Sequence, residues 1–281
     1  MGLISREQIA GMNIHYLFYS LEYFLDAQVK AGIKTIEFWP GTPHFFLTNR
    51  EYSDCKRVRR LLEERDLTLK VITPENCTYQ YQFAAQEKEQ FEKSREYFKK
   101  ALDVGEELGA EIMAINSGWG YWNEEREEAW KRSREMLSCL AEYAAAKKIR
   151  LAMESLRPQE SNLATTLTDV KRMLKEVEHP NLKAMIDLTA MGVAGETIDQ
   201  WFEELGEDII HMHFIDGNPY GHLVWGDGTH NLQECLETLK RHGYRGYLGQ
   251  EITEFDYFGD PAKADRRNME AYEPFILGNE S

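Results

Sequence analysis

The chain has 281 residues, of which 42% are hydrophobic and 12% aromatic, so a sizeable globular core can form. Its formal charge of −15 at pH 7 would repel a phosphate backbone, which argues against nucleic acid as a partner. The sequence has no apolar run as long as a membrane span, and its cysteines (Cys55, Cys77, Cys139 and Cys235) form no Cys-x-x-Cys pair. We therefore expect a cytoplasmic protein with reduced thiols and no membrane contact.

Predicted strands and helices alternate along the chain. The first strand is expected over Met12 to Phe18, and Ser20 is a suitable cap for a helix that runs to Gly32. A second strand over Lys34 to Trp39 ends before Pro40-Gly41. The other expected strands are 67–73, 111–116, 149–154, 182–187, the strand that contains His211 and His213, and 246–252; the other expected helices are 54–62, 87–108, 124–147, 168–177, a short one around Trp201, 231–242 and one after Asp260.

Eight strand–helix units in a chain of this length predict an α/β fold, a (β/α)8 TIM barrel. No Pro-rich or Ser-rich linker interrupts the alternation, so residues 1–281 are expected to form a single domain. The stretch from His211 to Thr229 is expected to be a short strand followed by a polar, glycine-rich loop.

Acidic or imidazole side chains stand at the ends of four consecutive predicted strands. Glu154 ends the fifth strand, Asp187 the sixth and Glu251 the eighth, and His213 lies near the end of the seventh. Active sites of such barrels lie at the C-terminal ends of the strands, so these side chains should converge. Taken alone, each acid is also explained as a helix cap or a rim ion pair. Together, three buried carboxylates need a cation, and the oxygen-rich set favours Mn²⁺, Co²⁺ or Mg²⁺ while leaving Zn²⁺ open.

Several short motifs lie in a specific order along the chain. They are Glu37-Phe-Trp39-Pro-Gly41-Thr-Pro43-His44-Phe-Phe46, Thr73-Pro74-Glu75, Glu154 with Glu160-Ser161-Asn162, Met185-Ile-Asp187, His211-Met-His213, His222 with Gly226-Asp-Gly228, and Gln250-Glu251. In this order and spacing, from about Ile36 to Ile252, the sequence resembles the xylose isomerase-like barrel superfamily. The resemblance is strongest to its ketose 3-epimerase branch, which includes fructoselysine 3-epimerases.

The resemblance implies that the same four residues hold the metal, with Mn²⁺ as the expected ion. It also implies that Glu154 and Glu251 act as acid and base in proton transfer at a carbon next to a carbonyl. The tagatose and psicose epimerases of the family carry a His where this chain has Ala190, and an Arg where it has His222. These two departures from the family pattern put specificity for a simple hexulose in doubt.

Other residues that follow the strands are candidates for substrate contacts, although loop packing explains each of them as well. Glu160 could orient a substrate hydroxyl or cap its loop, and His222 could bind a sugar oxygen or lie exposed. His211 should lie one pleat deeper than His213, and Asp216 should cap the following loop or orient His213. Further candidates for the pocket lining are Trp39, His44, Glu75 and Trp119.

The predicted function is that of a metal-dependent isomerase, most closely a 3-epimerase of a ketose or of a fructosamine such as fructoselysine. A metal-dependent lyase or dehydratase and an isomerase of the hydroxypyruvate or inosose type are the alternatives.

The expected partner is a sugar or amino sugar, whose ammonium group an acidic pocket with Glu75 would attract. We also expect a homo-oligomer, a dimer or larger. A DNA-cleaving relative of endonuclease IV is disfavoured by the acidic charge and by the eight histidines in total.

Overall fold

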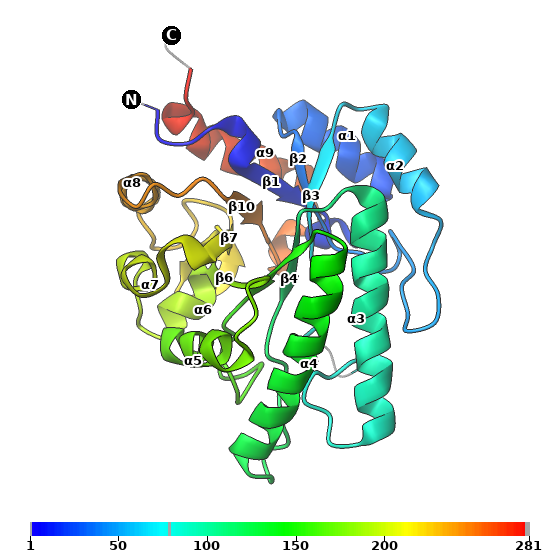
Figure 1. Ribbon diagram of the computed structural model, residues 1–281. Helices are drawn as coiled ribbons and strands as arrows, with labels where there is room; N and C mark the ends of the chain where they lie inside the picture. The colour runs from blue at the N-terminus through cyan, green and yellow to red at the C-terminus, as the bar shows by residue number, and fades with distance from the viewer. Residues whose placement is uncertain (1, 78–79, 279–281) are drawn as a thin grey trace.

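A closed barrel of eight parallel strands forms the centre of the computed structural model, which describes residues 2–77 and 80–278 (Figure 1). Seven strands lie side by side in chain order, and β10 closes the barrel between β7 and β1. This confirms the predicted (β/α)8 fold. The barrel strands are β1 (Ile9–Met12), β2 (Thr35–Phe38), β3 (Thr68–Ile72), β4 (Ile112–Ile115), β5 (Arg150–Met153), β6 (Leu182–Asp187), β7 (Ile209–His213) and β10 (Tyr247–Gln250).

The helices lie outside the barrel, and the two longest, α3 and α4, pack side by side on one flank (Figure 1). The predicted cap is confirmed at Ser20, whose hydroxyl accepts a hydrogen bond from the Tyr23 N–H, and the Asp54 and Asp260 carboxylates cap two other helices in the same way. The helices are α1 (Leu21–Ala31), α2 (Cys55–Glu63), α3 (Lys88–Leu108), α4 (Arg126–Ala146), α5 (Leu167–Val177), α6 (Leu188–Val193), α7 (Ile198–Leu205), α8 (Leu232–Arg241) and α9 (Pro261–Tyr272). Within the described residues, none of these helices is both long enough and apolar enough to cross a membrane.

The first strand begins and ends earlier than predicted. β1 covers Ile9–Met12, and a 3-10 turn follows over Ile14–Tyr16 where a strand over Met12 to Phe18 was expected. The prediction was wrong because the large side chains after Met12 imitate strand periodicity, whereas the true strand is short and buried on both faces. Asn13 ends it, since its side chain accepts from the Trp39 N–H at 2.7 Å and donates to the Trp39 carbonyl at 2.8 Å.

Two small elements after β6 and β7 were not predicted. An antiparallel hairpin, β8 (Asp216–Asn218) and β9 (Tyr220–Leu223), lies within the stretch expected to be an irregular loop. The Asp216 carboxylate accepts backbone N–H groups of Gly226 and Gly228, each at 2.9 Å, so it caps this loop and does not orient His213. Helix α6 begins directly after Asp187, which is its N-cap.

The barrel interior is filled in layers. A small cluster of buried apolar side chains occupies part of the lumen, and the larger core lies between the strands and the helices. His211 on β7 stands opposite Met185, and His213 stands opposite Asp187 and Gly249, so the polar layers lie toward the C-terminal ends of the strands. The lumen cluster comprises Val71, Ile112, Ala114, Ala152, Met185 and Ile210.

The last helix is tied to the start of the barrel by a buried polar network. The Asp265 carboxylate on α9 accepts hydrogen bonds from the Tyr16 hydroxyl and the Gln28 amide, each at 2.5 Å, and lies 3.0 Å from His15 Nε2. The two ends of the chain also meet, since the Leu3 N–H donates to the Phe275 carbonyl at 2.7 Å (Figure 1). Closure of the barrel therefore depends on residues at both ends of the sequence.

We propose that residues 1–281, of which 1, 78–79 and 279–281 lie outside the described part, form one cooperative domain. Urea unfolding followed by tryptophan fluorescence and by far-ultraviolet circular dichroism should then give superimposable transitions, because tryptophans occur in widely separated parts of the chain. Two separated transitions would contradict a single domain.

Candidate metal centre and active site

The four residues predicted at the strand ends come together. One ligand atom from each of Glu154, Asp187, His213 and Glu251 lies within 4.8 Å of every other. His213 Nδ1 is central, at 2.9 Å from Glu154 Oε1, 3.0 Å from Glu251 Oε2 and 3.7 Å from Asp187 Oδ2. Asp187 and His213 are buried, whereas Glu154 and Glu251 are partly accessible from the cavity above.

Asp187 divides its two oxygens between the fold and the site. Oδ1 accepts the Ala190 N–H at 2.6 Å as the cap of α6, and Oδ2 lies 3.0 Å from His222 Nε2. His222 Nε2 is also 3.4 Å from Glu251 Oε2, and its Nδ1 is 2.9 Å from the Thr253 hydroxyl. His222 is therefore buried against the carboxylates, which contradicts the alternative of an exposed loop histidine.

The ionisation of the cluster reflects its crowding. Burial, reinforced by Glu251 and Asp187 and opposed by His213, raises the pKa of Glu154 to about 7. Burial alone would lower the pKa of His213, but the surrounding carboxylates, with Glu251 first, hold it well above its usual value. The Asp187 carboxylate likewise outweighs burial and raises the pKa of His222 to about 9.

These residues fit a divalent cation. The donors are three carboxylates and one imidazole, a hard, oxygen-rich set with a single nitrogen. Among the described residues, Arg157 is the only Lys or Arg that lines the cavity, and it forms an ion pair with Glu160 rather than with the cluster. A cation held by Glu154, Asp187, His213 and Glu251 would offset the repulsion among the three carboxylates.

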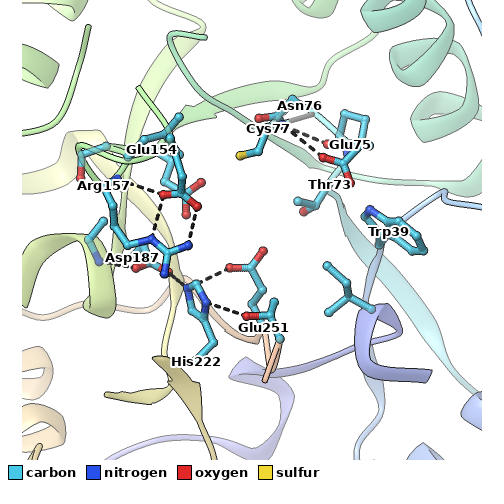
Figure 2. A pocket seen from close by; sticks show the side chains of 17 residues that line it. Trp39, Thr73, Glu75, Asn76, Cys77, Glu154, Arg157, Asp187, His222 and Glu251 are labelled. Atoms are coloured by element: carbon cyan, nitrogen blue, oxygen red, sulfur yellow. Dashed lines mark hydrogen bonds and ion pairs between the residues drawn. The ribbon is translucent and has the colours of Figure 1, made fainter. Parts of the chain in front are cut away.

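A cavity of about 220 Å³ opens above the cluster. Figure 2 shows Glu154, Arg157, Asp187, His222 and Glu251 on one side of it and Trp39, Thr73, Glu75, Asn76 and Cys77 on the other. Of the predicted substrate contacts, the structure thus places Trp39, Glu75, Glu160 and His222 in its lining. The cavity is also lined by residues that were not predicted as substrate contacts: Ile14, Thr73, Pro74, Asn76, Cys77, Ser155, Leu156, Arg157, Ala190 and Thr253.

Arg157 is the most consequential of the missed residues. Its guanidinium holds both oxygens of Glu160, with Nε at 2.9 Å from Oε2 and Nη2 at 2.5 Å from Oε1. The Arg157 backbone N–H also donates to Glu160, so Glu160 organises its own loop as well as lining the cavity. The two residues lie in a turn, where the i,i+3 rule for helices does not apply, so no sequence signal indicated this pair.

Two predicted pocket residues lie elsewhere. His44 is buried, with Nδ1 at 2.8 Å from the Asn13 amide and Nε2 at 3.0 Å from the Tyr19 carbonyl, so it supports the loops instead of lining the cavity. Trp119 does not line the cavity; its carbonyl accepts from Gln82, and its ring packs edge-on near Tyr121. Both predictions assumed that a residue just after a strand points inward, whereas the loops turn these two away.

The sequence matches the xylose isomerase-like TIM barrel family over residues 25–274. The chain therefore belongs to this family. It is 29% identical over 259 residues to a fructoselysine 3-epimerase of Escherichia coli O157:H7, an alignment that covers 92% of this chain and 94% of the relative.

Solved structures share the fold. A D-allulose 3-epimerase from Methylomonas sp. superposes with a TM-score of 0.80 at 19% identity, covering 98% of this chain and 100% of the other. A D-psicose 3-epimerase from Clostridium cellulolyticum H10 gives a TM-score of 0.77 at 18% identity, covering 96% of this chain and 99% of the other. At these identities the likeness concerns the barrel alone.

If the cluster holds a cation, protein stripped with a chelator should take up one Mn²⁺ per chain and become more stable. At a free concentration of 100 times Kd the gain is about 2.7 kcal/mol, measured as a rise in the urea midpoint. Asp187→Asn keeps an oxygen to cap α6 but loses a charged ligand, so it should abolish this gain. Glu160→Gln is the matched control, because Glu160 lines the same cavity outside the cluster; equal loss in both variants would contradict the assignment.

Proposed function

We propose that this protein is a divalent-metal-dependent carbohydrate epimerase that acts on the carbon next to a ketose carbonyl, most specifically a 3-epimerase of a fructosamine such as fructoselysine. The observation that carries the proposal is the convergence of two partly accessible glutamates, Glu154 and Glu251, on one buried imidazole beneath a sugar-sized cavity. The family membership and the epimerase relative at 29% identity support it. The proposal includes Mn²⁺ as the ion, a cytoplasmic location and a homo-oligomer of two or more chains.

The chemistry requires a base on one face of the substrate and an acid on the other. A divalent cation bound here would act as a Lewis acid that stabilises the negative charge developing on the substrate oxygens. Glu154 and Glu251 follow strands three positions apart around the barrel, so their carboxylates approach a bound sugar from different sides. One removes the proton from C3 and the other returns a proton to the opposite face, which inverts that carbon.

Residues around the two glutamates orient the substrate. His222, fixed between Asp187 and Thr253, can share a hydrogen bond with a sugar oxygen next to Glu251. Arg157 has donors beyond the two that Glu160 uses, and these suit hydroxyl oxygens. The Trp39 ring offers an apolar surface on the other side of the cavity for sugar C–H groups (Figure 2).

The charge of the cavity favours an amine-bearing substrate over a phosphorylated one. Five carboxylates line it against one guanidinium and one imidazole, so it stays negative after a divalent cation binds. Glu75, which faces the catalytic groups, makes a 3.2 Å hydrogen bond with the Cys77 N–H and has no cationic partner among the described residues. An ammonium group of the substrate would supply that partner, whereas a phosphate would be repelled.

The decisive experiment is solvent exchange. In D₂O, the Mn²⁺-loaded protein should introduce deuterium at C3 of fructoselysine and form a new epimer, because the returning proton comes from a carboxyl group that exchanges with solvent. NMR measures both the label and the epimer. Psicose, tagatose and fructose are tested beside it. Glu251→Gln should reduce exchange by at least about 100-fold, within the range for general acid–base catalysis, while Glu254→Gln, outside the cavity lining, is the matched control.

Other outcomes of this experiment would overturn the proposal in recognisable ways. A product of different composition indicates a lyase or dehydratase, and deuterium at C2 of an aldose product indicates an aldose–ketose isomerase. No exchange with any ketose, despite bound metal, excludes ketose epimerisation.

The role of Glu75 is tested by comparing substrates. Glu75→Gln should lower kcat/KM for fructoselysine about 10-fold, the equivalent of losing ~1.4 kcal/mol of charge attraction. A neutral ketose should be unaffected, because it lacks the ammonium group. Equal losses for both substrates would show that Glu75 does not recognise charge.

A further inference from the structure

Beneath the metal cluster lies a second, fully buried group of polar side chains that the proposed chemistry does not use. The Glu37 carboxylate on β2 lies 3.0 Å from His213 Nε2 through Oε1 and 3.0 Å from His211 Nε2 through Oε2. The Thr73 hydroxyl donates to Oε1 at 2.6 Å. Glu37 and both histidines are 0–1% exposed.

Packing of the barrel lumen does not by itself explain a carboxylate at position 37. An isolated buried carboxylate costs several kcal/mol, so an apolar side chain of similar size would be cheaper at this position if packing were its only role. Instead, both carboxylate oxygens are engaged, Oε1 by Thr73 and His213 and Oε2 by His211. The fold also leaves room for it, because a Cβ at Gly249 would overlap Glu37 Oε2.

The hydrogen bonds fix which nitrogen of His213 faces the cluster. His213 Nε2 donates its proton to Glu37, so Nδ1 is the nitrogen that faces Glu154 and Glu251 and that would bind a metal after releasing its own proton. A buried imidazole without this acceptor would be free to adopt the other tautomer or to tilt. A carboxylate acceptor also makes the ligating nitrogen more basic.

Glu37, His211 and His213 also form a geometrically possible metal site of their own. The nitrogen–oxygen distances of 3.0 Å are those of hydrogen bonds, and the Thr73 donor already engages Oε1. Hydrogen bonds therefore account for the contacts of the Glu37 carboxylate with Thr73, His211 and His213, and the number of ions bound per chain distinguishes the two arrangements.

We propose that Glu37 is a positioning residue that, through its hydrogen bond to His213, orients the imidazole so that Nδ1 binds the metal, with Thr73 and His211 holding the carboxylate in place. The inference rests on the proposed function, since it concerns the same metal centre. It assigns a role in metal binding to a residue that touches neither the metal nor the substrate.

The test uses the whole chain and metal affinity as the main readout. In Glu37→Gln, one side of the former carboxylate becomes an N–H donor that faces an imidazole donor, so affinity for Mn²⁺ and Co²⁺, measured by competition with a chelating dye, should fall about 10- to 100-fold. The visible spectrum of bound Co²⁺ should also change, because the imidazole is no longer held. Asp265→Asn is the matched control: it neutralises another buried carboxylate that meets a histidine at 3.0 Å, and it should lower stability without changing either metal readout.

A second variant keeps the test valid if the Glu37→Gln protein does not fold. Gly249→Ala keeps the carboxylate but displaces it, so affinity should fall in the same direction. The inference is overturned if folded Glu37→Gln binds metal with wild-type affinity and gives an unchanged Co²⁺ spectrum. It is also overturned if the wild-type protein binds a second ion and Glu37→Gln is the one variant that loses it. Wild-type protein that binds no ion overturns the inference together with the proposed function, whereas metal binding without C3 exchange overturns only the epimerase.

Discussion

The organisation of this protein depends on repulsion among carboxylates that three barrel strands bring to one point. Glu154, Asp187 and Glu251 surround His213 Nδ1 at 2.9 to 3.7 Å. Three negative charges at this separation in a partly buried site repel each other strongly, and one imidazole does not neutralise them. The shifted pKa values of Glu154 and His213 express this imbalance. A site that is strained without a cation is well suited to bind one.

The cluster lies between a buried polar group below it and an open cavity above it. Below, Glu37 and His211 fill the lumen where other barrels use apolar layers, and Gly249 leaves the space that this requires. Above, the loops contribute Arg157, Glu160 and His222 on one side and Glu75 and Trp39 on the other. In the proposed function, the barrel sets where a proton would be moved, while the loops would select the substrate.

Much of the candidate site was predictable because its residues stand at strand ends, and strand ends were predictable from periodicity. Glu154, Asp187, His213 and Glu251 needed only the correct alternation of strands and helices and the rule that barrel sites lie at the C-terminal face. Loop residues were harder. His44 and Trp119 follow strands as Trp39 and Glu75 do, yet they turn away from the cavity, and no local pattern distinguishes the two pairs. Arg157 was missed for the same reason.

The sequence by itself determined the number and order of the strand–helix units, the Ser20 cap and the four residues of the cluster, because these depend on local periodicity and on short-range hydrogen bonds. Tertiary structure alone decided that β1 lies at Ile9–Met12, that Asp216 caps its own loop, and that Glu37 pairs with histidines 174 and 176 positions away. Such contacts arise when the barrel closes and brings distant strands side by side. Their energy comes from burial and long-range charge pairing, which leave no pattern within one segment of the chain.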